Sequence, residues 1–154
     1  MKQCREAMMT IEFDIPDDRY YDATHHMWTQ PQEGTDRVRV GIDALGLQSL
    51  GDLAYISLRA VGDAVQRGEA IGTLEAAKMT GDLIAPVSGV LAARNEAALR
   101  DPMLVNDDPY GAGWMVAIQP RDWETESGKL VSGDRLPDWV AGEIERYRSQ
   151  GWVD

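Results

Sequence analysis

Hydrophobic residues in the middle of the chain fall in short runs that are separated by turn residues. These runs predict strands at residues 27–30, 37–42, 53–58, 70–74, 83–87, 90–93 and 114–118. Segments rich in glycine, proline and aspartate lie between them, at 31–36, 62–63, 67–69, 86–89 and 111–113. Many short strands with frequent turns predict a mainly β protein, either a sandwich or a barrel.

Helical patterns are fewer and shorter. Asp43 is placed to cap a helix over 44–50 that ends at Gly51, and a second short helix is expected around 95–100. After Pro120 a polar stretch, 121–135, leads to a helix in which apolar residues recur at helical spacing. These residues are Leu136, Val140, Ile144 and Tyr147.

The patterns divide the chain into three parts. Residues 1–19 show no clear periodicity and are expected to form an N-terminal extension, residues 20–120 a single β domain, and residues 121–154 a helical segment. Trp139 and Trp152 give that segment apolar anchors, so we expect it to pack on the domain. No heptad pattern or long exposed apolar edge is visible, and the expected state is a monomer.

Composition limits the possible functions. The formal net charge is −11, which argues against nucleic-acid binding because phosphate neutralisation needs clustered Lys and Arg. No apolar run is long enough for a signal sequence or a membrane span, so the expected location is cytoplasmic, with no membrane partner. Cys4 is the only cysteine, which leaves no internal disulfide and no cysteine metal cluster.

Lys78 is the strongest candidate for a functional residue. Only three lysines are present, Lys2, Lys78 and Lys129, among 15 basic residues. Lys78 lies at the tip between the strands predicted at 70–74 and 83–87, where a modifying enzyme could reach it. A lysine extended by an acyl chain spans roughly a dozen Å, which suits a swinging arm. The alternative is a hairpin-tip lysine without a function.

The flanks of this hairpin resemble those of biotinyl and lipoyl domains. The similar segments are Gly62-Asp63 before the first strand and Ala85-Pro86-Val87-Ser88-Gly89 after the second. Biotinyl domains usually carry methionine on both sides of the lysine. The run Glu75-Ala76-Ala77-Lys78-Met79 has methionine on one side only, so biotin is the less favoured attachment.

Motifs outside the hairpin resemble the glycine cleavage system H-protein family over about residues 20–120. The matching segments are His26-Met27-Trp28, Val40-Gly41-Ile42-Asp43, Leu50-Gly51-Asp52, Glu75-x-x-Lys78 with Asp82, and the run from Leu104 to Trp114. The resemblance implies a lipoyl-domain-like flattened β-barrel (a barrel-sandwich hybrid) with short helices and a C-terminal helix. It also implies a lipoate bound covalently to Lys78.

The same resemblance suggests roles for neighbouring residues. Glu75, Ala77, Met79 and Asp82 would be recognised by a lipoate-attachment enzyme, and His26 would contact the groove near the arm. The cofactor would carry the chemistry, which makes the protein a carrier rather than an enzyme. No nucleophile–base pair, phosphate loop or zinc ligand set competes with this interpretation. An unmodified interaction domain is the remaining alternative of a different class.

Three departures from the family pattern leave the pathway open. H-proteins usually have Ser-Val-Lys-Ala at the attachment site, where this chain has Ala76-Ala77-Lys78-Met79, and both terminal segments differ. These differences favour the divergent H-protein-like lipoate-binding proteins that act with a heterodisulfide-reductase-like complex in bacterial sulfur oxidation. The alternative is glycine cleavage, with glycine decarboxylase, aminomethyltransferase and dihydrolipoyl dehydrogenase as partners.

Overall fold

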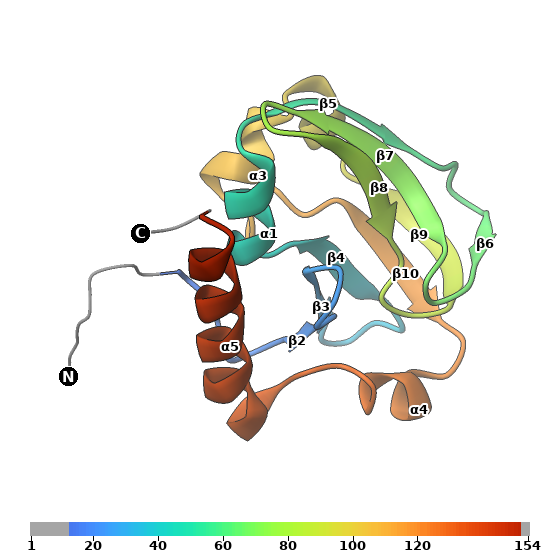
Figure 1. The fold of residues 1–154 in the computed structure, drawn as a ribbon. Helices are drawn as coiled ribbons and strands as arrows, with labels where there is room; N and C mark the ends of the chain where they lie inside the picture. The colour runs from blue at the N-terminus through green and yellow to red at the C-terminus, as the bar shows by residue number, and fades with distance from the viewer. Residues whose placement is uncertain (1–12, 152–154) are drawn as a thin grey trace.

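The computed structural model describes residues 13–151. The expectations for Cys4 and Trp152 lie outside the described residues. Two antiparallel sheets enclose the core, and short helices cover the ends of the barrel (Figure 1). A C-terminal helix lies against the outside, so the predicted flattened β-barrel with a C-terminal helix is confirmed. No helix in the described part of the chain is long and apolar enough to cross a membrane.

The larger sheet has six strands. In spatial order these are β2 (Tyr20–Tyr21), β3 (Met27–Pro31), β4 (Val38–Ile42), β10 (Val116–Pro120), β9 (Gly89–Arg94) and β6 (Ala64–Val65). Alternate residues of β4 point inward, with Val38 and Val40 buried and Arg39 exposed. This alternation is expected of strands with one face on the core.

The smaller sheet has three strands, β5 (Leu53–Leu58), β7 (Ala70–Ala76) and β8 (Thr80–Ile84), with β7 in the middle. Its buried Ile71, Leu74 and Leu83 belong to the same core as Val40 and Ile118 of the larger sheet. The β7–β8 hairpin extends beyond the core at the end of the barrel near α1 (Figure 1). The barrel therefore gives this hairpin a rigid base.

The helices are α1 (Ala44–Leu50), α2 (Glu96–Arg100), α3 (Met103–Asp107), α4 (Trp123–Ser127) and α5 (Leu136–Ser149), with a 3₁₀ turn at Gly133–Arg135 before α5. The predicted caps of α1 are present. Asp43 Oδ1 accepts a hydrogen bond from the Gly46 amide at 2.8 Å. Gly51, at φ +79°, donates its amide to the Leu47 carbonyl at 2.8 Å. The left-handed φ explains the glycine.

Several predicted boundaries were wrong. The strand expected at 83–87 is β8, which covers Thr80–Ile84, because pairing with β7 places Thr80 opposite Glu75 and continues to Ile84. Residues 85–88 are buried but irregular, so their apolar character reflects burial and not a strand. The strand expected at 114–118 begins at Val116. Helices α3 and α4 and the two-residue strands β2 and β6 were not predicted.

The C-terminal helix is attached mainly through a few large side chains. Tyr147 is 1% exposed, and its hydroxyl donates to the Leu45 carbonyl at 2.8 Å. The Trp139 ring packs against Tyr21 with 5.5 Å between centroids. The predicted helical spacing is confirmed, although Val140 and Ile144 are only partly buried. The division of the chain at residues 19/20 and 120/121 stays a prediction.

Candidate functional site

Lys78 lies exposed at the tip of the β7–β8 hairpin, and backbone hydrogen bonds fix that tip. The Lys78 amide donates to the Leu50 carbonyl at 3.0 Å, and the Ala77 amide donates to the Asp52 carbonyl at 2.9 Å. Across the turn, the Ala76 amide donates to the Met79 carbonyl at 2.9 Å. The tip is thus tied to the connection between α1 and β5, while its side chains remain available.

The Lys78 side chain lies over the C-terminal end of α1. Its Nζ donates to the Gln48 carbonyl at 2.9 Å. The last carbonyls of a helix lack partners within the helix and favour a positive group. Gly51 lies beneath the lysine, and a Cβ there would lie 3.3 Å from Lys78 Cγ. This arrangement positions the lysine stem and leaves Nζ at the surface.

Two carboxylates share the outward face of the hairpin with neighbouring threonines. The register pairs Glu75 with Thr80 and Asp82 with Thr73, which places all four residues on one face. Glu75 and Asp82 are both exposed. The structure thus brings four of the predicted site residues around Lys78: Glu75, Ala77, Met79 and Asp82.

A groove of about 240 Å³ begins beside Met79. Ile42, Leu74 and Leu83 give it an apolar floor. Its remaining lining residues come from the loop before β3 and the first residue of β3, from α1, from the hairpin and from α5: Thr24, His25, His26, Met27, Gly46, Ser49, Leu50, Met79, Gly81, Asp82 and Arg146. The groove therefore has an apolar interior and a polar rim, and Met79 in its lining is the residue that follows Lys78.

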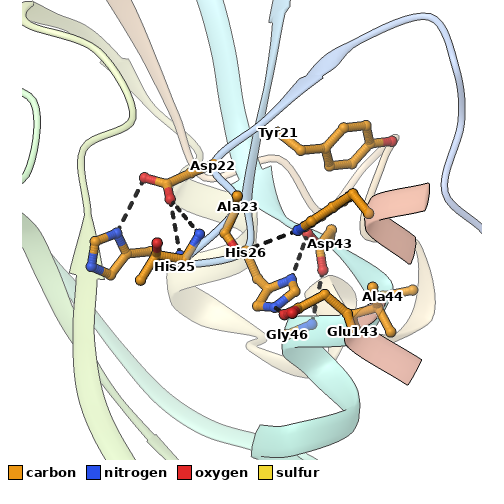
Figure 2. A network of polar contacts seen from close by, with 12 residues as sticks. Tyr21, Asp22, Ala23, His25, His26, Asp43, Ala44, Gly46 and Glu143 are labelled. Atoms are coloured by element: carbon orange, nitrogen blue, oxygen red, sulfur yellow. Dashed lines mark hydrogen bonds and ion pairs between the residues drawn. The ribbon is translucent and has the colours of Figure 1, made fainter. Parts of the chain in front are cut away.

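His26 lies in the groove wall, where it was predicted, but its contacts extend to α5. It is 5% exposed and adopts φ +59° immediately before β3. Nδ1 is 3.1 Å from Asp43 Oδ2, and Nε2 is 2.7 Å from Glu143 Oε1 (Figure 2). Its ring also stacks on Trp139 with 5.4 Å between centroids. His26 therefore connects the N-cap of α1 to the C-terminal helix.

Both carboxylates favour the protonated ring. Burial disfavours the charged imidazolium, but the hydrogen bonds and charges of Asp43 and Glu143 outweigh this and raise the pKa of His26. Burial acts on the pKa of Glu143 in the upward direction, yet Arg146 and His26 hold it below its usual value. Arg146 bonds Glu143 at 2.8 and 3.2 Å, so a chain of ionic contacts crosses the back of the groove.

His25 is adjacent in sequence but has a different environment. Its side chain is 43% exposed, and Nδ1 is 3.2 Å from Asp22 Oδ2. Both histidines lie in the short connection between β2 and β3 and not within a strand. Within residues 13–151 no group of three or more His, Cys, Asp or Glu side chains is arranged to hold a metal ion.

The ionic contacts of the groove could not be predicted from local sequence patterns. Glu143 is 117 positions from His26, and Arg146 comes from the same helix, so no local pattern joins them. Tyr110 lies in the segment from Leu104 to Trp114 that resembles the family. Its hydroxyl accepts from the Ala44 amide at 2.9 Å, which ties the loop before β10 to the start of α1.

A flattened β-barrel with an exposed lysine at a fixed hairpin tip, beside an apolar groove, defines the class of carrier domains that bear an acylated lysine. Comparison with known proteins narrows this class. The family model described as glycine cleavage H-protein matches residues 19–142, and the chain belongs to that family.

Individual relatives agree with this assignment. The glycine cleavage system H protein of Thermus thermophilus is 46% identical over 109 residues, which cover 71% of this chain and 83% of that protein. A probable glycine cleavage system H protein of Natronomonas pharaonis is 40% identical over 131 residues, covering 85% and 100%. The crystal structure of such a protein from Mycobacterium marinum superposes with a TM-score of 0.68 at 36% identity, covering 83% of this chain and 98% of that one.

H-proteins are non-catalytic carriers with a lipoate bound covalently to a lysine. Membership of this family confirms the prediction of a carrier rather than an enzyme. It also confirms lipoate as the cofactor of the family. The residues of this chain fit such a group. Lys78 offers an exposed amine, and the neighbouring apolar groove suits a hydrocarbon chain and a dithiolane ring.

Proposed function

We propose that this protein is a lipoyl carrier and that Lys78 bears the lipoyl group. The observation that carries the proposal is the combination of an exposed lysine on a rigid tip with an apolar groove next to it. A lysine at this position can move its acyl chain outward to a partner enzyme and inward to the groove. Biotin is disfavoured because methionine flanks the lysine on one side only.

Acylation suits the contacts that Lys78 already makes. Forming an amide removes the positive charge of Nζ but leaves one N–H, which can still donate to the Gln48 carbonyl. The backbone bonds of Ala77 and Lys78 do not involve the side chain, so they persist after modification. The tip therefore keeps its shape while the arm changes state.

The surface around Lys78 supports recognition by a lipoate-attachment enzyme. We propose that this enzyme reads Glu75 and Asp82 as a pair of carboxylates on one face of the hairpin. Ala77 and Met79 keep the immediate neighbours of the lysine free of charge. Because these residues are exposed, their contribution is expected in the rate of modification and not in the stability of the fold.

The groove has the properties needed to protect a reactive group on the arm. When bound, the lipoyl group supplies a dithiol that interconverts with a disulfide and holds a transferred group on sulfur. Ile42, Leu74 and Leu83 exclude water from the floor, and the polar rim can hold a small charged group. The chain positions and shields the transferred group, and its partners carry out the reactions.

We propose glycine cleavage as the pathway. The support is the family match and the relatives that are named glycine cleavage system H protein. In that role the partners are glycine decarboxylase, aminomethyltransferase and dihydrolipoyl dehydrogenase. Asp82, on the rim of the groove, is the carboxylate available to an aminomethyl group.

One observation keeps sulfur oxidation as a second candidate. Arg146 lines the groove from α5, beyond residue 142, where the match to the family model ends. It places a guanidinium on the lining of the groove, and a positive charge there favours an anionic sulfur species over an ammonium group. In this role a heterodisulfide-reductase-like complex would be the partner.

Exchange between glycine and bicarbonate separates the two pathways. The lipoylated protein would be assayed with glycine decarboxylase, with a known H-protein as positive control and Lys78→Arg as negative control. Exchange that depends on Lys78 is the expected result. Lipoylated protein that supports no exchange, beside an active control, would refute glycine cleavage and leave the sulfur carrier as the candidate.

A further inference from the structure

A carboxylate–imidazole pair lies at the rim of the groove, in the turn before β3. Asp22 Oδ1 accepts hydrogen bonds from the amides of Thr24 at 2.9 Å and His25 at 3.0 Å, and Asp22 Oδ2 accepts from His25 Nδ1 at 3.2 Å (Figure 2). The Asp22 side chain is 7% exposed, whereas that of His25 is 43% exposed. The carboxylate is therefore fixed, and it orients a ring that solvent and an arm can reach.

The contact with Asp22 determines which nitrogen of the His25 ring holds the proton when the ring carries only one. Burial acts to raise the pKa of Asp22, but the bonds from His25 and Thr24 outweigh it and leave this carboxyl ionised at neutral pH. An ionised carboxylate only accepts hydrogen bonds, so the proton lies on Nδ1 and the lone pair on Nε2. Within residues 13–151, Nε2 of His25 has no hydrogen-bond partner.

The neighbouring groups of the groove leave His25 as the available base. Both ring nitrogens of His26 are bonded to carboxylates, and Arg146 is bound to Glu143. Asp82, from β8, is the other ionisable side chain on the rim. His25 lines the same groove as Met79, which follows Lys78, so an arm of roughly a dozen Å can bring a sulfur to it.

We propose that His25 is the general base for a thiol of the reduced lipoyl arm and that Asp22 positions it. Nε2 accepts the proton as the S–H bond breaks, which leaves a thiolate beside an imidazolium that Asp22 stabilises. The reverse transfer restores the thiol, so the step needs no oxidant or reductant. The inference rests on the proposed function of Lys78 and assigns the chain a role in activating the arm.

This step matters because the thiolate, not the thiol, is the nucleophilic form of sulfur. An imidazole next to the thiol increases the fraction of thiolate at neutral pH. Partner enzymes would then meet an arm whose sulfur is already activated. In many active sites a carboxylate orients a histidine that acts as a base toward a protein side chain. Here the histidine would act on a thiol of the cofactor.

Alkylation of the reduced arm by iodoacetamide tests this proposal. The Cys4→Ser background removes the only cysteine thiol, so every reactive thiol belongs to the arm. Rates would be measured from pH 5 to pH 10, after intact mass has confirmed the adduct on Lys78. In His25→Gln we expect the rate at neutral pH to fall about tenfold and its pH profile to move upward. The alkylation rate should fall less in Asp22→Asn. It should not change in Asp63→Asn, which removes a carboxylate from the turn between β5 and β6.

A second measurement needs no variant of His25 or Asp22. The imidazole of His25 would be titrated by NMR in the lipoylated protein with the arm oxidised and then reduced. Reduction should move the titration of His25 upward, and the Lys78→Arg protein should show no difference. An alkylation profile unchanged in His25→Gln, or a His25 titration indifferent to reduction, overturns the proposal. Absence of any adduct on Lys78 refutes the proposed function itself, and this inference falls with it.

Discussion

The two sides of the groove are built in opposite ways. The Lys78 tip is held by backbone hydrogen bonds to the α1–β5 connection, and its side chains project freely. The α5 side is held by the side chains of His26, Trp139 and Tyr147. A segment fixed by its backbone can change its side chains, or accept a covalent group, without losing its position. A segment fixed by side chains depends on each one.

The difference matches the proposed functions of the two sides. The arm must be read, modified and moved, so its surroundings are exposed and uncharged next to the lysine. The wall must stay in place while the arm enters and leaves, and its charges are paired in the His26–Glu143–Arg146 chain. Variants on the two sides should therefore separate effects on modification from effects on stability.

The largest expected loss of stability comes from the α5 side of the groove, which is held by side chains. Tyr147→Ala removes a buried ring and its hydrogen bond to Leu45, and we expect it to lower the free energy of unfolding by about 3 kcal/mol. Urea denaturation measures this loss. Tyr55→Ala is the matched control, since Tyr55 is 55% exposed and its loss should cost under about 1 kcal/mol. Equal losses in the two variants would contradict the proposed attachment of α5.

On the Lys78 side, which is held by its backbone, Gly51→Ala is the one side-chain change that we expect to cost stability. The residue adopts φ +79° with ψ −158°, a region that only glycine tolerates, so alanine should cost about 2 kcal/mol. The added Cβ would also meet Lys78 Cγ at 3.3 Å. Gly142→Ala, in open space on α5, is the control and should be neutral or slightly stabilising. Thermal unfolding of both variants measures this difference, and a Gly51→Ala protein as stable as the parent would show that the tip is not fixed there.

The pH dependence of stability should follow His26. Because its pKa is raised in the folded state, the native protein holds a proton that the unfolded chain releases above about pH 6.5. This stabilisation is complete below that pH and is lost as pH rises through the folded pKa, with a slope of at most about 1.4 kcal/mol per pH unit. Urea denaturation at several pH values measures the free energy of unfolding. Its decrease with pH should appear in the parent protein and be absent from His26→Gln. The same slope in both proteins would assign it to other groups.

The smallest effect on stability should come from Lys78, the proposed attachment residue. Lys78→Arg keeps a cation over the end of α1, and its free energy of unfolding should stay within about 0.5 kcal/mol of the parent. Its modification by a lipoate-attachment enzyme should be abolished. A large loss of stability would mean that the lysine is structural, which the exposed position argues against.

Much of this organisation could be predicted from the sequence because it depends on local patterns. Short apolar runs between turn residues predicted most strands, and Asp43 and Gly51 predicted the two ends of α1. Lys78 and its flanks could be located because a hairpin tip and its attachment motif are contiguous. The predicted residues Glu75, Ala77, Met79 and Asp82 lie around the lysine for the same reason, although their roles stay predictions.

The rest depends on contacts between distant segments. The contact between His26 and Glu143 joins positions 117 residues apart, and only the packing of α5 creates it. β8 was misplaced because Thr80, Gly81 and Asp82 have the composition of a turn, yet pairing with β7 makes them a strand. The different environments of His25 and His26 likewise depend on which carboxylates surround each ring.

Lys78 is the proposed attachment site of one lipoyl group, on which the other proposals depend. Intact mass spectrometry of the protein after reaction with a lipoate-attachment enzyme tests it most directly, with peptide mapping to locate the adduct and Lys78→Arg as the control. We expect the mass of one lipoyl group, located on Lys78 and absent from the variant. An unmodified protein beside a modified H-protein control, or an adduct on Lys129 instead, would contradict it.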